Sequence, residues 1–365
     1  MRQSFINLAA ILGLAAATLW LAGLFAATLW VAGCGSSAPT QAGQDAGDLR
    51  ILSLTPNVTE VLFAMGLGDR IVGRSNYCTY PQEALAIPAV GDTLQMNQEK
   101  IIALRPTLAF LITSRQAVIG TLEKMGIRTV ALRSDRMDEL LVSIRSIGRE
   151  TGRTEAAEAL VGRIQADLEA VRGRVRGLPR PRTLFAFPMT VGSAQMMVAG
   201  RGTFVDELLD VAGAENAFPD VANWPAVSPE RIIALAPEVV VVNATGDDAA
   251  GDRLEAVRRA WANWTTVPAV AGGRVYILTE PYLTIPGPRV GLAAEKLAEV
   301  IHPPAAGAGE GAFGVPTAFL SGVPRVACQP VLPASAHGLT SKPWHPAKGT
   351  PNTYASAPAA GEGAR

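Results

Sequence analysis

Histidine, the side chain on which many enzymes rely for acid–base chemistry, is nearly absent from the body of this chain. The three histidines are His302, His337 and His345. No histidine precedes them to serve in a Ser-His-Asp triad or a zinc site. The sequence also lacks a phosphate-binding loop, a metalloprotease helix and a nucleophile elbow. We therefore expect no enzymatic activity and no cofactor.

A ten-residue motif occurs twice, at 97–106 and at 228–237. Each copy has a polar residue that can cap a helix, an acid two positions later, an Ile-Ile pair, a Leu and a closing Pro. An apolar stretch that reads as a strand follows each copy. This spacing is too long for a solenoid and predicts two similar lobes of one protein.

The acids of this repeat motif are Glu99 and Glu230. Asn97 and Ser228 are predicted to cap the first turn of a short helix. The acids then stand in that turn, where negative charge suits the positive end of the helix dipole. They either stabilise the helix start only, or have a further role on the surface.

The elements around the repeat motif alternate between strands and helices, which predicts an α/β fold with mainly parallel sheets. The predicted strands are 50–54, 71–73, 107–112, 128–132, 183–187, 238–242 and 275–278, and the predicted helices are 58–65, 117–125, 203–211, 253–261 and 290–301. They fall into an N-terminal lobe, 49–148, and a C-terminal lobe, 179–302.

One long helix is predicted to bridge the lobes within 149–178. Apolar residues recur there at steps of three and four, which marks one helix face. These residues are Ala157, Leu160, Val161, Ile164, Leu168, Val171 and Val175.

The N-terminus reads as an export signal over 1–33, with a basic start, an apolar run and small residues before a cut point. The sequence Val-Ala-Gly-Cys resembles a bacterial lipobox, in which Cys34 is lipidated. The apolar run is also long enough to span a bilayer if left uncut. Residues 34–48 form a flexible linker, and 303–365 read as a disordered tail. Whether the apolar run is cleaved as a signal or kept as a membrane anchor, the lobes are expected outside the cytoplasm.

The net charge bears on nucleic-acid binding, and the cysteine content bears on disulfide formation. The formal net charge is zero, and nucleic-acid binding usually needs a basic face, so we expect no nucleic acid. Cys78 and Cys328 are expected to stay unpaired, with Cys78 a small half-buried side chain.

The chain resembles the class III periplasmic binding proteins, the substrate-binding subunits of ABC importers for cobalamin, ferric siderophores and haem. The resemblance covers Leu49 to His302 and rests on the two copies of the repeat motif and on Thr55–Gly66, Tyr77–Pro81, Gly213–Asn216 and Pro286–Arg289. It implies a ligand held between two lobes that one long helix joins, with little closure.

The resemblance also implies the partners. In that family one glutamate from each lobe reaches basic pockets on the permease, and Glu99 and Glu230 occupy the matching positions. We therefore expect a monomeric, extracytoplasmic lipoprotein that is anchored in the bilayer through Cys34 and serves an importer made of a permease and its ATPase.

The side chains expected at the ligand are mostly aromatic, because large chelates are held by aromatic and apolar walls with few polar anchors. They are Tyr77, Tyr80, Trp224, Tyr282 and Arg289. Tyr77 and Trp224 match aromatic positions that contact the corrin in cobalamin receptors. Other expected tryptophans are absent from 92–96 and 112–115, which leaves a ferric siderophore open. Arg289 either pairs with an acidic chelate group or forms a salt bridge at the start of the last helix, and Trp224 is either a ligand contact or ordinary packing.

Three rival interpretations stay open. Tyr77 could ligate haem iron. The lobes could belong to a sensor or adhesion lipoprotein that transports nothing. A metallocluster enzyme on a related scaffold would need clustered cysteines, and Cys78 is the only cysteine in the lobes.

Overall fold

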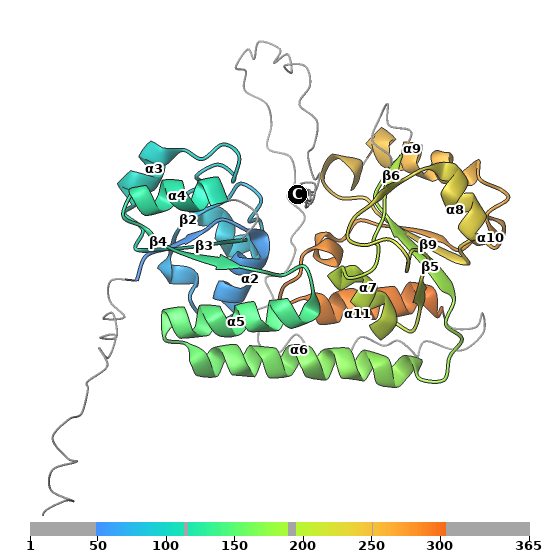
Figure 1. Cartoon of the computed structure of the whole chain (residues 1–365), viewed down its shortest axis with the longest axis horizontal. Helices are drawn as coiled ribbons and strands as arrows, with labels where there is room; N and C mark the ends of the chain where they lie inside the picture. Colours follow the sequence, from blue (N-terminus) through green and yellow to red (C-terminus); the bar gives the residue numbers. More distant parts are fainter. Residues whose placement is uncertain (1–48, 113–115, 189–194, 250, 304–365) are drawn as a thin grey trace, which may run out of the picture. The chain divides into compact units, whose positions relative to one another are not determined.

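The computed structural model describes residues 49–112, 116–188, 195–249 and 251–303 (Figure 1). The predicted signal, Cys34, the linker, Cys328 and the predicted tail lie outside these ranges. Among the helices within them, none combines the length and the apolar character needed to cross a membrane.

The N-terminal lobe is built on a parallel four-stranded sheet in the order β2-β1-β3-β4 (Figure 1). Its strands are β1 (Ile51–Ser53), β2 (Ile71–Arg74), β3 (Leu108–Ile112) and β4 (Arg128–Leu132). Its helices are α2 (Pro56–Ala64), α3 (Gln98–Leu104), α4 (Gln116–Lys124) and α5 (Met137–Thr151), with short 3₁₀ turns η2 (Gly68–Arg70) and η3 (Gln82–Ala86).

The C-terminal lobe repeats this plan with a parallel sheet in the order β10-β9-β5-β7. Its strands are β5 (Arg182–Ala186), β7 (Glu215–Asn216), β9 (Val239–Asn243) and β10 (Val275–Leu278), and a small antiparallel pair joins β6 (Met196–Met197) to β8 (Ala226–Val227). Its helices are α7 (Phe204–Val211), α8 (Pro229–Leu235), α9 (Gly251–Ala262), α10 (Pro268–Ala271) and α11 (Val290–Ile301), with 3₁₀ turns η4 (Gly246–Ala249) and η5 (Pro281–Thr284).

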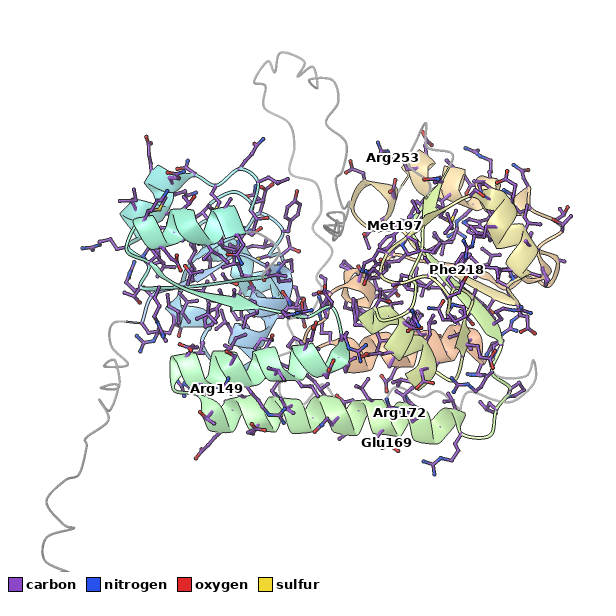
Figure 2. The ribbon with its side chains drawn as sticks, viewed as in Figure 1. Arg149, Glu169, Arg172, Met197, Phe218 and Arg253 are labelled. Atoms are coloured by element: carbon purple, nitrogen blue, oxygen red, sulfur yellow. The ribbon has the colours of Figure 1, made fainter. Side chains whose placement is uncertain are left out.

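The predicted α/β fold with two parallel sheets and a bridging helix is confirmed. That helix is α6 (Thr154–Val175), and its buried residues are the seven apolar ones whose spacing predicted it. It packs against α5, α7 and α11 (Figure 1). Figure 2 shows two charged residues of α6, Glu169 and Arg172, whose side chains are exposed.

The sequence did not separate α5 from α6. The chain leaves α5 through Gly152, whose φ of 67° is a left-handed conformation that glycine adopts without a Cβ clash. The sequence predicted one helix within 149–178 and did not single out α5, most of which precedes that range. The short strands β6, β7 and β8 were also missed, because two residues carry no recognisable alternation.

Both sheets place one face in a core of their own and the other in a shared core. Side chains alternate along a strand, so Leu108 and Phe110 enter the shared core while Ala109 and Leu111 enter the core of the N-terminal lobe. The strand β9 alternates in the same way between the shared core and the core of the C-terminal lobe. The shared core also contains the seven buried residues of α6, so this helix joins the two lobes through apolar contact as well as through the chain.

The close packing of α5 on α6 predicts an asymmetry between two glycines. A Cβ at Gly148 of α5 would lie 2.5 Å from the Cβ of Ala157. We expect Gly148→Ala to lower the free energy of unfolding by about 1–3 kcal/mol, because the helices must move apart. Urea denaturation followed by circular dichroism measures the change.

The matched control is Gly162→Ala on α6, where a Cβ would meet no atom within 4 Å. This change should raise the free energy of unfolding by about 0.5–1 kcal/mol, since alanine is the better helix former. Equal effects of the two substitutions would contradict the packing.

Candidate functional site

A buried ion pair joins the two lobes. Arg289, which precedes α11, donates from Nε to Oε2 of Glu60 at 2.8 Å and from Nη2 to Oε1 at 2.6 Å. Glu60 belongs to α2 of the N-terminal lobe. The side chains are 14% and 2% exposed, respectively. Paired, charge-assisted bonds of this kind fix orientation as well as contributing energy, so the salt bridge expected as one alternative for Arg289 is present.

The protein environment acts on Glu60 in two opposite directions. Burial raises the pKa of its carboxyl group, while the hydrogen bonds and the positive charge of Arg289 lower it, and the balance lies above the ordinary value. A carboxylate in so dry a position depends on its partner, since an unpaired buried charge is strongly unfavourable.

Two tyrosines lie against the guanidinium of Arg289. Its Cζ is 3.8 Å from the ring centroid of Tyr80 and 5.3 Å from that of Tyr282. Tyr80 comes from the N-terminal lobe and Tyr282 from η5 of the C-terminal lobe. These distances suit cation–π attraction. Three of the five predicted ligand residues are thus together, and we call Glu60, Tyr80, Tyr282 and Arg289 the inter-lobe junction.

Tyr77 stands on the same loop as Tyr80 and has a 66% exposed side chain. The loop is fixed from below: the backbone N–H of Tyr77 donates to Oγ of Ser75, and Cys78 is completely buried with its Sγ 3.8 Å from the carbonyl oxygen of Ser53. Burial raises the pKa of the Cys78 thiol. The expectation of a half-buried Cys78 is therefore wrong, because its side chain is completely buried.

Trp224 belongs to a separate aromatic group in the C-terminal lobe. Its ring centroid lies 5.6 Å from that of Phe187 and 6.4 Å from that of Phe204. Trp224 and Phe187 are both partly exposed, so the packing expected as one alternative is present and part of each ring faces outward. Phe187, at the end of a predicted strand, was not singled out from the sequence.

A second polar contact between the lobes was not anticipated at all. Glu207 of α7 accepts a hydrogen bond of 2.7 Å from the backbone N–H of Met137, the first residue of α5. Its other oxygen lies 3.2 Å from Nη2 of Arg136. An acid of one lobe therefore satisfies a free N–H at the start of a helix in the other. Burial raises the pKa of Glu207 despite these partners.

The two copies of the repeat motif form α3 and α8, with Glu99 and Glu230 exposed in the first turn of each. Asn97 caps α3, since its side chain accepts from the N–H of Lys100 at 2.8 Å. The cap predicted for Ser228 is wrong, because its side chain makes no capping bond to the helix backbone. Its hydroxyl bonds the carboxylate of Glu230 instead, and this bond lowers the pKa of Glu230.

Comparison with known proteins identifies the chain's family. Residues 51–282 match the family described as periplasmic binding protein. The chain belongs to this family. It is 31% identical over 259 residues to the uncharacterised ABC transporter substrate-binding lipoprotein YvrC of Bacillus subtilis, covering 70% of this chain and 80% of that protein.

Two further relatives are named for the ligands that they bind. The vitamin B12-binding protein of Yersinia pseudotuberculosis serotype O:3 is 28% identical over 264 residues, covering 72% of this chain and 87% of that one. The periplasmic haem-binding protein RhuT of Roseiflexus sp. RS-1, solved without haem, superposes with a TM-score of 0.61 at 27% identity, covering 70% of this chain and 98% of that one.

The chain is therefore an extracytoplasmic substrate-binding protein of an ABC importer, with the importer's permease as its partner, and it is not an enzyme. In the part of the chain that the structure describes, no group of three or more acid, histidine or cysteine side chains is placed to hold a metal ion.

The inter-lobe junction predicts a large effect of Glu60→Ala on stability. The substitution leaves Arg289 buried without its partner, and we expect the free energy of unfolding to fall by about 3–5 kcal/mol. Chemical denaturation at neutral pH measures this loss.

Glu158→Ala is the control, because it breaks the exposed pair of Glu158 with Arg145. Exposed pairs contribute about 1 kcal/mol or less. Similar losses in the two variants would show that the junction adds no more than a surface contact.

Proposed function

We propose that this binding protein captures a cobalamin-type metal chelate between its lobes and delivers it to the permease. The observation that carries the proposal is the junction itself, where Arg289 holds Tyr80 of one lobe and Tyr282 of the other within 5.3 Å of its Cζ. Aromatic walls with few polar anchors suit a large, flat, partly apolar ligand.

The charge of the junction favours a ligand without free carboxylates. Two donor groups of Arg289 are already bonded to Glu60, so an acidic ligand would have to compete with a buried carboxylate. A corrinoid carries amide side chains around its ring and needs no such exchange. The vitamin B12-binding relative supports the same choice.

Haem is the second candidate. The exposed phenol of Tyr77 is a chemically suitable iron ligand, and the haem-binding relative RhuT has the same fold. The two carboxylates of haem, however, would meet a guanidinium, that of Arg289, whose charge is already compensated by Glu60. A ferric siderophore is the remaining chelate of this class, and aromatic side chains suit it equally.

Tyr77→Ala tests where the ligand lies. Tryptophan fluorescence is titrated with cyanocobalamin, haem and a panel of ferric siderophores. We expect saturable quenching by cyanocobalamin, and we expect Tyr77→Ala to weaken it about tenfold through loss of one aromatic contact. Absence of saturable quenching by every chelate would overturn the proposal.

Tyr77→Phe separates the two leading ligands. It keeps the ring and removes the oxygen, so cobalamin affinity should stay within about twofold, whereas a haem site would lose its phenolate ligand and change its Soret spectrum. Trp224→Phe should reduce the amplitude of the fluorescence quenching. Trp264 packs on Trp261, and Trp264→Phe should leave that amplitude unchanged.

The two exposed acids of the repeat motif are proposed to dock on the permease, and Cys34 to hold the protein at the membrane after removal of residues 1–33. Neither Glu99 nor Glu230 makes an ion pair within the described residues, so both are free to pair with basic groups of a partner.

Charge reversal at both positions tests the docking. Glu99→Lys with Glu230→Lys should lower uptake by at least about a hundredfold, because like charges across an interface are strongly unfavourable, while ligand affinity stays unchanged. Glu155→Lys, at an exposed acid in the first turn of α6, should leave both intact. Loss of ligand affinity in the double variant would count against the assignment.

A further inference from the structure

The two copies of the repeat motif also share a pattern of burial. The first isoleucine of each pair, Ile101 and Ile232, is completely buried, whereas the second, Ile102 and Ile233, has a side chain 59% and 39% exposed. Large apolar side chains scattered singly over a surface need no explanation. Here the same side chain is exposed at the same position of both copies.

Each exposed isoleucine lies beside the acid of its own copy. Glu99 and Ile102 are three residues apart on α3, and Glu230 and Ile233 three apart on α8. Residues at this spacing are neighbours on a helix surface. Each helix therefore presents a carboxylate and an isoleucine side by side, and we call these two surfaces the docking tips.

The backbone of the two tips is matched as well. α3 ends at Arg105 with a φ of 44°, and α8 ends at Ala236 with a φ of 47°. Both are left-handed conformations that residues with a Cβ adopt at a cost. Both precede a buried proline. The same strained ending at both copies gives the two tips the same local shape.

We propose that Ile102 and Ile233 insert into two apolar sockets of the importer permease, next to basic groups that pair with Glu99 and Glu230. This inference rests on the docking proposed above and adds an apolar contact to it. The charges of the tips select the partner, since the acids need a basic surface beside the socket.

One further charge, at the α8 tip, fits this occupant. Arg231, next to Glu230, is already held by Asp220 at 2.6 Å and lies 5.7 Å from the ring centroid of Phe218, which Figure 2 labels. Its charge is therefore partly compensated before docking. An anionic lipid surface would repel the acids, and a second copy meeting the same tip would bring like acids together.

The test measures binding to the purified permease–ATPase complex in lipid nanodiscs by biolayer interferometry. Ile102→Ser and Ile233→Ser should each weaken binding about tenfold, and the double variant about a hundredfold, because each loses the burial of one aliphatic side chain. Thermal unfolding and cyanocobalamin affinity should match the wild type, since both side chains are exposed.

Val142→Ser is the matched control. Val142 of α5 is 59% exposed, as Ile102 is, but stands outside the tips. Its substitution should leave binding to the importer unchanged. Substituting Ile102 by Leu should restore most of the affinity lost in Ile102→Ser.

The outcomes separate this inference from the docking itself. If the glutamate reversals abolish binding and the isoleucine double variant binds as the wild type, the apolar sockets are refuted and the docking stands. If neither set changes binding, both fail. Serine variants that dissociate a dimer in sedimentation, or that lose binding to empty nanodiscs, would identify a second copy or lipid as the occupant and overturn the proposal.

Discussion

The apolar face of α6 is the constraint on which the two-lobed structure depends. Its seven buried side chains lie in a core that also receives one face of each sheet. Neither sheet alone covers the apolar face of α6, because the opposite face of each sheet packs into a smaller core of its own lobe. Burial of this stripe, at roughly 25 cal/mol per Å² of apolar surface, stabilises both lobes at once. Apolar packing alone does not fix the relative orientation of the lobes, and the polar contacts of Glu60 and Glu207 then specify it.

Periodic features of the sequence predicted the fold well. The stripe of α6 repeats every three or four residues, and the strands at 128–132 and 275–278 and the helix at 290–301 have the predicted bounds. Contacts between distant residues could not be predicted in this way. Glu60 and Arg289 are 229 positions apart, and no local pattern indicates which acid a given arginine meets. The aromatic types of the candidate site were recognisable, whereas their grouping into a junction and a separate Trp224 group depends on tertiary packing.

The repeat motif shows how far similarity carries within one chain. Both copies form a short helix, bury the first isoleucine and end in a left-handed residue. The capping residues nevertheless differ in action, because the amide of Asn97 reaches the backbone while the hydroxyl of Ser228 bonds the neighbouring carboxylate. A side chain with two competing local partners is a place where sequence similarity predicts position but not hydrogen bonding.

The shared core has a mechanical consequence. A wide hinge motion of the lobes would separate apolar side chains from α6 and expose them to water. The arrangement of the lobes that keeps these side chains buried is therefore the low-energy state. A rigid receptor binds its ligand with little loss of conformational entropy. The same rigidity means that it stores little strain energy that could drive release of the ligand. The work of separating the lobes has to come from outside the molecule, and in the docking proposed above the permease would supply it by holding each lobe separately.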